Sequence, residues 1–138
     1  MGVFPPNVLP EEINNDHPQR IRALMVSGSN PLRSYADTTA YEQAFAKLDL
    51  LVTIEAAMTE TAILSHYVLP ARSGYEKWDG TFFQVMYPDY YFDMRRPVVD
   101  PDGEQVEEAH IYVGMAERLG MIPDYPAKLR DLARDRVN

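Results

Sequence analysis

The stretch "ALMVSGSNPLRSY" (residues 23–35) decides the fold of this chain. It begins inside a short apolar run, "IRALMVS" (21–27), that is bounded by polar sequence. Such a run is typical of a strand buried on both faces, as in parallel sheets. The run stops at Gly28, and the polar turn "SNP" (29–31) opens a new segment. We therefore predict a buried strand that carries a polar turn at its carboxyl end.

A helix and a second strand follow this turn. Asp37 or Thr38 can cap the helix. Apolar residues recur behind the cap at helical spacing, at Tyr41, Ala44, Phe45 and Leu48. The segment "LDLLVTIE" (48–55) repeats the buried-strand pattern, so the order predicts a parallel βαβ unit with a right-handed crossover. The turn and Glu55 then lie at the carboxyl ends of parallel strands, where open α/β sheets bind ligands.

The next part of the chain predicts a third strand and a long loop. A short capped helix over 59–65 precedes a strand over 66–70, which ends at Pro70. The segment 74–103 is rich in Tyr, Phe and Pro and has no periodicity, so we expect loops and irregular strands there. Loops of this length usually carry a function or belong to an interface. We favour an interface over a binding groove.

Two helices are predicted near the C-terminus. The first is amphipathic, covers 104–119 and ends at Gly120 as its C-cap. Its inward residues are expected to be Val106, Ala109, Tyr112, Val113, Ala116 and Leu119. The second follows Pro126. We thus expect a Pro-rich, partly ordered lead (1–20), an α/β domain (21–120) and a C-terminal helix (121–138).

Composition removes several classes of function. The chain has 138 residues, about one domain, and a formal net charge of −8, which argues against a nucleic-acid or anionic-membrane binder. The absence of cysteine excludes thiolate metal sites and Cys nucleophiles within this sequence. The three histidines, His17, His66 and His110, lie far apart and have no metal-ligand spacing. We see neither a signal peptide nor an apolar run of the ~20 residues that cross a membrane.

Three short segments are candidate binding elements, each with a plainer alternative. The turn after the first strand can bring backbone amides to an anion, or it can be an ordinary Pro-containing turn without a ligand. Its single glycine lacks the three-glycine dinucleotide pattern and disfavours a conventional NAD site. Glu55 can accept hydrogen bonds from a ribose or a base edge, or simply face solvent. Thr59 and Thr61 can cap a helix, and the same amides can face a phosphate.

Two further features offer little chemistry. The segment "EKWDGT" (76–81) contains two carboxylates suited to acid–base work, but no nucleophile or metal cluster accompanies them. We expect His66 to pack or to bond a backbone carbonyl. The residues therefore support a cofactor-holding α/β domain without a catalytic constellation.

Five motifs in fixed order carry a resemblance to a known family. They are the G-x-N-P turn Gly28–Pro31, the acidic strand end Glu55, Thr59–Ala62, the strand Ser65–Pro70 and the segment Glu76–Thr81. Together, over roughly residues 9 to 120, they resemble the third domain of molybdopterin oxidoreductases of the DMSO reductase and formate dehydrogenase type.

The resemblance implies an α/β, Rossmann-like three-layer domain with a mostly parallel sheet. In that family two molybdopterin guanine dinucleotides hold a molybdenum or tungsten ion, and this domain cradles the guanosine-diphosphate arm of one. The carboxylate at position 55 would favour guanine over adenine. The implied cofactor-binding residues are Gly28, Ser29, Asn30, Pro31, Glu55, Thr59, Glu60 and Thr61.

Departures from the family pattern limit what this chain can do alone. Ser65, His66 and Tyr67 replace the usual Ala-Asp-Val, and the sequence after Phe82 differs from the family's loop near the cofactor. The metal ligand and the other dinucleotide's domain are absent from this sequence. We therefore expect a fragment or domain that is inactive alone, whose partners are the remaining domains and, as a further candidate, an iron–sulfur subunit, with no nucleic-acid or membrane contact.

Two alternatives stay open at this point. One is a free-standing nucleotide-binding regulator, and the other is an assembly module that has lost the site. The sequence gives no indication of localisation.

Overall fold

The computed structural model describes residues 5–80 and 92–121 and divides into two units, Met1–Val106 and Glu107–Asn138. The first unit begins with a 3-10 turn η1 (Pro6–Val8) and helix α1 (Leu9–Asn14). It continues through β1 (Ala23–Ser27), α2 (Pro31–Ser34), α3 (Thr38–Phe45), β2 (Leu50–Glu55), α4 (Glu60–Leu64), β3 (Tyr67–Pro70), β4 (Asp79–Gly80) and β5 (Met94–Arg95). The second unit contains α5 (Glu108–Arg118).

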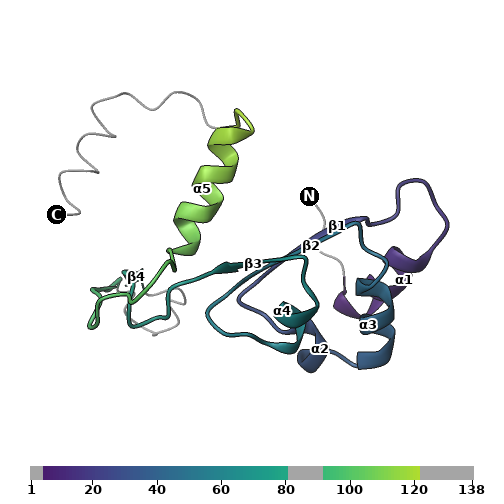
Figure 1. The fold of residues 1–138 in the computed structure, drawn as a ribbon, viewed down its shortest axis with the longest axis horizontal. Coiled ribbons are helices and arrows are strands. Elements are labelled where there is room, and N and C mark those ends of the chain that lie inside the picture. Colours follow the sequence, from purple (N-terminus) through teal and green to yellow (C-terminus); the bar gives the residue numbers. More distant parts are fainter. Residues whose placement is uncertain (1–4, 81–91, 122–138) are drawn as a thin grey trace. The chain divides into compact units, whose positions relative to one another are not determined.

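A parallel sheet of order β1-β2-β3 organises the first unit (Figure 1). The register places Val26 opposite Thr53 and Thr53 opposite Val68. All three strands lie inside the ranges predicted from sequence, 21–27, 48–55 and 66–70. The predicted α/β class with a mostly parallel sheet is therefore confirmed.

The apolar stripe of α3 forms the core under the sheet. Its residues Tyr41, Ala44 and Phe45 are at most 2% exposed, and they pack with Val26 and Leu51 of the strands. The α3 helix starts as predicted, because the Oδ1 atom of the N-cap residue accepts a hydrogen bond from an amide of the first turn at 3.0 Å.

The lead contributes a helix that the sequence pattern did not predict. Ile13 of α1 is 1% exposed and belongs to the same core as α3. The phenolic oxygen of Tyr41 donates a hydrogen bond to the Pro6 carbonyl, which fixes the turn before α1. With only six residues, α1 is too short to show a helical period in the sequence.

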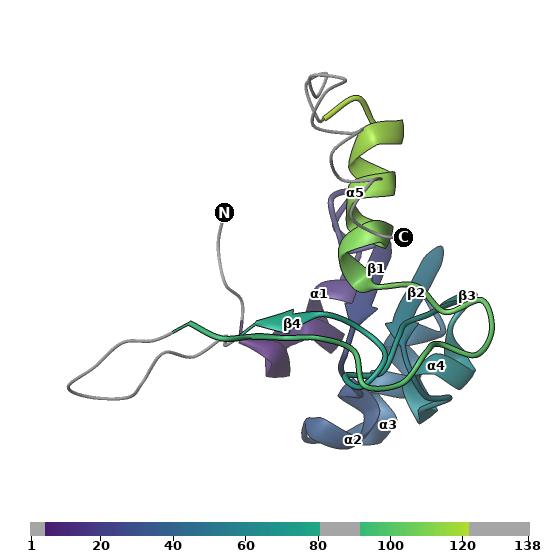
Figure 2. The same ribbon diagram turned by 90° about the vertical axis from the view of Figure 1, so that its left-hand side faces the viewer.

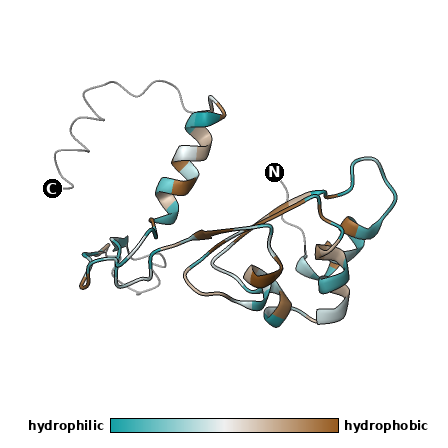
Figure 3. Cartoon of the chain, in the orientation of Figure 1, coloured by the Kyte–Doolittle hydropathy of each residue, from teal (hydrophilic) through white to brown (hydrophobic). Residues whose placement is uncertain are grey.

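Among the described residues of this unit, helices cover one face of the sheet. Helices α1 to α4 lie on the same side of the strands, and the strands form a largely apolar band (Figures 1 and 3). On the other face, Ala23, Met25, Leu50 and Tyr67 share one side by register and are all exposed, Tyr67 by 64%. On this second face, burial as predicted is found at Ile54, which is fully buried, but not at the exposed strand residues, and the described part of this unit places no helix there. A short apolar run cannot reveal whether its own unit covers both faces.

The region predicted as a long loop contains a small antiparallel pair, β4 with β5, whereas residues 81–91 lie outside the described residues. Arg95 bonds Asp79 across this pair at 3.0 Å. An isolated bridge joins Ala71 to Val106, with the Val106 amide donating to the Pro70 carbonyl at 3.1 Å. The bridge brings the end of this region next to β3.

Helix α5 differs in two respects from its prediction. It begins at Glu108 rather than at 104, because Val106 is engaged in the bridge. None of its residues is buried, so the expected inward packing of its apolar stripe is wrong for the described residues. Its end is as predicted: Gly120 has φ +66°, and the hydrogen bonds of a Schellman motif close the helix.

Figure 2 shows α5 as the one helix of the second unit's described part. The helix expected after Pro126 lies outside the described residues. Among residues 5–80 and 92–121, no helix has the length and apolar character needed to cross a membrane.

Replacing Ile13 by alanine tests whether the lead belongs to the core. Ile13→Ala should lower the free energy of unfolding by about 2–4 kcal/mol, because it leaves a cavity against α3. Ile63→Ala is the matched control: Ile63 is 66% exposed, so its loss should stay within about 0.5 kcal/mol. Urea denaturation measures both. Equal small losses would mean that α1 does not contribute to the core.

Candidate functional site

The candidate site lies at the carboxyl edge of the parallel sheet, where β1 passes into the turn 28–31. Gly28 has φ +56°, a conformation that side chains with a Cβ atom rarely adopt. Its amide donates to the Ile54 carbonyl at 3.0 Å, which continues the pairing with β2. The Gly28 amide is therefore already bonded, while within the described residues the amides of Ser29 and Asn30 donate to no protein group.

The side chain of Asn30 connects the turn to α4. Its Nδ2 atom donates to Oε2 of Glu60 at 2.8 Å. Its Oδ1 atom accepts from the Thr61 hydroxyl at 2.7 Å and from the Thr61 amide at 3.3 Å. Because a carboxylate only accepts and an amide N–H only donates, these partners fix the orientation of the Asn30 amide.

Glu60 is held as a carboxylate. Its Oε1 atom accepts from Nε of Arg33 at 2.7 Å, so each of its oxygens has a donor. These contacts lower the pKa of Glu60 to about 2, and the hydrogen bond from Asn30 is the largest cause. Both Glu60 and Arg33 are exposed, so we treat the ion pair as a geometric constraint and not as a source of stability.

A chain of hydroxyl groups continues from this network into the core. Thr61 is fully buried, and its hydroxyl also accepts from the Leu32 amide at 3.4 Å. Ser65 donates to the Thr61 carbonyl at 2.9 Å, so the 2.5 Å contact between Ser65 and Thr53 must have Thr53 as the donor. The buried Thr53 of β2 is thereby linked to the turn that follows β1.

Glu55 and Thr59 flank this network. One oxygen of Glu55 accepts from the Ala56 amide at 2.8 Å. Its other oxygen accepts no hydrogen bond from the described part of the chain, so it remains open to a ligand. The Thr59 hydroxyl accepts from the Ala62 amide at 3.2 Å, which is the predicted helix cap.

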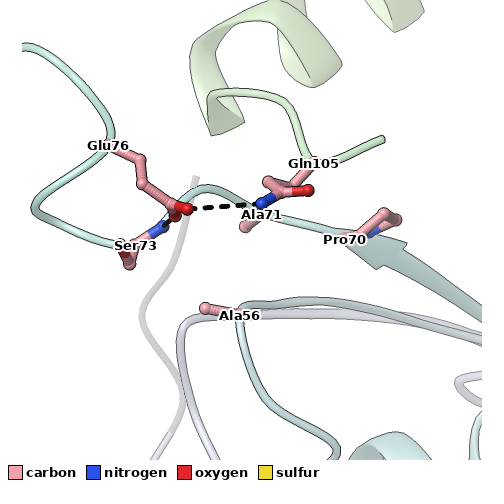
Figure 4. Close-up of a pocket in the computed structure, with 6 residues that line it drawn as sticks. All are labelled: Ala56, Pro70, Ala71, Ser73, Glu76 and Gln105. Atoms are coloured by element: carbon pink, nitrogen blue, oxygen red, sulfur yellow. Dashed lines mark hydrogen bonds between the residues drawn. The ribbon is translucent and has the colours of Figure 1, made fainter. Parts of the chain in front are cut away.

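A pocket of about 390 Å³ opens beside this edge, at the ends of β2 and β3. Glu76 is its acidic group: it accepts from the Ser73 amide at 2.8 Å and from Nε2 of Gln105 at 3.3 Å (Figure 4). Hydrogen bonds from Ser73, then from Gln105, lower the pKa of Glu76. The pocket is lined by Ala56, Pro70, Ala71, Ser73, Glu76 and Gln105.

Sequence reasoning missed two of these pocket residues. Ser73 stands three residues before Glu76, a spacing at which a serine amide and a glutamate side chain commonly pair. That signal was present in the sequence. Gln105 gave no signal, because the bridge between Ala71 and Val106 alone brings it to the pocket.

His66 takes the role opposite to the expected one. Its Nδ1 atom accepts a hydrogen bond from the Leu51 amide at 2.9 Å, while its own amide donates to the Leu51 carbonyl. The ring therefore closes the start of the β2–β3 pairing. Among the described residues, no group of three His, Asp or Glu side chains could hold a metal ion.

The structure thus brings the turn 28–31 together with Glu60 and Thr61 through direct hydrogen bonds. Glu55 ends the strand that pairs with β1, but it makes no direct bond to this network. The described part of the edge contains no nucleophile hydrogen-bonded to a base.

Comparisons with known proteins place the chain in a family. The family model described as molybdopterin oxidoreductase matches residues 1–118. The F420-dependent formate dehydrogenase subunit alpha of Methanocaldococcus jannaschii is 38% identical over 112 residues, 81% of this chain and 16% of that protein. The probable oxidoreductase YyaE of Bacillus subtilis is 34% identical over 110 residues, 80% of this chain and 16% of the relative.

A solved structure agrees with these matches. Acetylene hydratase from Pelobacter acetylenicus superposes with a TM-score of 0.71 at 27% identity, over 84% of this chain and 16% of that one. The chain therefore spans about one sixth of the length of the relatives it matches. The family-level resemblance predicted from the five motifs is confirmed.

Removing the Asn30 amide should return the pKa of Glu60 toward the ordinary carboxyl value. Asn30→Ala is expected to raise the pKa of Glu60 well above about 2, because it deletes the largest cause of the depression. Any stability that Glu60 contributes in the native chain is present above the ordinary carboxyl pKa and is lost as the pH falls toward 2. In the variant this contribution is smaller and is fully lost at a higher pH, because the folded-state pKa lies closer to the unfolded one.

Carboxyl-carbon NMR as a function of pH measures the pKa of Glu60 directly. Arg33→Ala is the control. It should raise the pKa of Glu60 by less, since the hydrogen bond from Arg33 lowers that pKa less than the bond from Asn30 does. An unchanged Glu60 pKa in Asn30→Ala would contradict the network.

Proposed function

Since the chain belongs to the molybdopterin oxidoreductase family, we propose that it binds the guanosine-diphosphate arm of a molybdopterin guanine dinucleotide. In this proposal the chain is one domain of a larger molybdenum or tungsten oxidoreductase and is inactive alone. The metal is held by other parts of that enzyme. When bound, the cofactor supplies two-electron redox or oxygen-atom transfer at its metal, and the residues of this chain position one arm.

One observation carries the proposal: free hydrogen-bonding groups of opposite polarity face the same sheet edge. The unbonded amides of Ser29 and Asn30 are donors suited to a diphosphate. The open oxygen of Glu55 is an acceptor suited to a guanine edge or a ribose. Parallel pairing of Ser27 with Ile54 puts the turn and the end of β2 side by side.

The donors and acceptors present fit a guanine nucleotide. Guanine offers an N1–H and an exocyclic amine to a carboxylate, whereas adenine offers no N1–H donor. A conventional adenine dinucleotide site would instead use a three-glycine turn, and this turn has one glycine. We assign the site to Gly28, Ser29, Asn30, Pro31, Glu55, Thr59, Glu60 and Thr61.

An assembly role accompanies the binding role. The uncovered sheet face exposes Met25, Leu50 and Tyr67, and the β4–β5 region exposes Trp78 and Met94. Apolar surface of this kind supports packing against further polypeptide. We propose that the remaining domains of the parent enzyme cover it, and that an iron–sulfur subunit is a further candidate partner.

Titration with nucleotides tests the proposed binding. In amide NMR spectra of the chain, GDP should shift the signals of residues 28–33, Glu55 and 59–62 more strongly than ADP does. Glu55→Ala should weaken GDP binding by about tenfold, the effect of one charged hydrogen bond, and should reduce the preference over ADP. Glu42→Ala, on the exposed side of α3, removes the same charge and should bind GDP as the native chain does.

Two results would contradict the proposal. Equal shifts with GDP and ADP would exclude guanine selectivity. A folded chain without any response to millimolar GDP would favour the assembly role alone.

A further inference from the structure

Each polar atom of the Asn30 and Glu60 side chains already has a hydrogen-bond partner in the protein. The Oδ1 atom of Asn30 serves both donors of Thr61, and its Nδ2 atom serves Glu60. Each oxygen of Glu60 accepts one hydrogen bond, one from Asn30 and the other from Arg33. Side chains used in this way are better suited to hold neighbouring groups in place than to bind a ligand themselves.

The pair joins two elements that cannot hold their positions by themselves. Helices α2 and α4 have four and five residues, far below the ~12 residues at which isolated helices become stable in water. Asn30 is the N-cap residue of α2, and Glu60 is the first residue of α4. The bond between them spans 30 positions of sequence and connects the loops after β1 and β2.

The donors and acceptors around Asn30 and Glu60 fix the direction of the hydrogen bond between them. Thr61 presents two donors to Asn30, so the amide nitrogen of Asn30 must face Glu60. Arg33 presents a donor to the other oxygen of Glu60, so a carboxylate is the group that satisfies both neighbours. While position 30 keeps its amide, a neutral amide at position 60 can satisfy only one of these two neighbours.

We propose that Asn30 and Glu60 are positioning residues of the nucleotide site: they hold the turn 28–31 against α4 so that the free amides of Ser29 and Asn30 face the ligand, and neither side chain contacts it. This inference rests on the proposed function and revises the roles that the family resemblance implies for these two side chains. The ligand class is the diphosphate of a guanine nucleotide.

Exchanging the two functional groups tests the proposal. Asn30→Asp places two carboxylates, which are both acceptors, next to each other. In Glu60→Gln, the new amide nitrogen must face either the Asn30 amide nitrogen or the Arg33 guanidinium, so that two donors meet. In the double variant Asn30→Asp/Glu60→Gln, the amide of position 60 can donate to position 30 and its oxygen can still accept from Arg33. The carboxylate placed at position 30 would keep the acceptor contact with Thr61, so every bond is restored and the one between positions 30 and 60 has its direction reversed.

The single variants change the charge in opposite directions, and the double variant keeps the native net charge. Each single variant should weaken GDP binding by about fivefold or more, the effect of one lost hydrogen bond to a charged group. The double variant should return to within about twofold of the native affinity, because it restores that bond. Gln43→Glu, on the exposed side of α3, adds the same charge as Asn30→Asp and controls for simple repulsion of the nucleotide.

Each outcome decides the matter. Native-like binding by both single variants would overturn the proposal, and so would a double variant as weak as the two losses combined, which is the result expected if these side chains touch the ligand. Thermal unfolding of the native chain and the three variants separates binding from folding, because the exposed pair should change the midpoint little.

Amide chemical shifts without nucleotide give a second, independent readout. The signals of Ser29, Asn30 and Leu32 should move in both single variants and return in the double variant. If the native chain does not bind GDP, the proposed function fails, and these shifts still decide the positioning role: their return supports it and their failure to return overturns it.

Discussion

Parallel pairing of β1 with β2 is the constraint on which the rest of this structure depends. Two parallel strands cannot be joined by a tight turn, so the chain must cross over through α2 and α3. The crossover places the stripe of α3 under the strands and builds the core there. The same pairing sends both strands out at one edge, and the Gly28 amide extends it by one hydrogen bond to Ile54. Core and candidate site are therefore two consequences of one pairing.

The two sides of this edge are stabilised differently. Helix α3 is held by buried apolar side chains, with Tyr41 stacked on Tyr35 and in edge contact with Phe45 at ring distances of 5.7 Å. Helices α2 and α4 are too short for such a stripe. Each buries an apolar residue, Leu32 and Ala62, and polar side chains hold the two helices to each other and to Thr53 of β2. Hydrogen bonds fix direction as well as distance, whereas apolar packing tolerates small shifts. A binding turn therefore benefits from support by hydrogen bonds.

The sequence predicts what depends on local pattern. Strand positions, the Asp37 cap, the stripe of α3 and the Gly120 helix end each follow from residues within one or two turns of one another, and the structure has all of them. What it does not predict depends on distant partners. The Asn30–Glu60 bond joins residues 30 positions apart, and only the parallel register makes them neighbours. Helix α5 shows the same limit, because its amphipathic pattern predicts the helix correctly but does not identify what covers its apolar stripe.

The uncovered sheet face has the same physical origin. A crossover that runs under one side of the strands leaves the other side to a different layer, and parallel sheets are ordinarily covered on both. In this unit Met25, Leu50 and Tyr67 remain exposed, although their sequence pattern is that of buried strands. The chain spans about one sixth of its relatives, so polypeptide able to supply that layer exists in those proteins. The exposed strands and the unbonded groups at their carboxyl edge are thus both consistent with the proposed role, a domain whose surfaces are completed by further polypeptide.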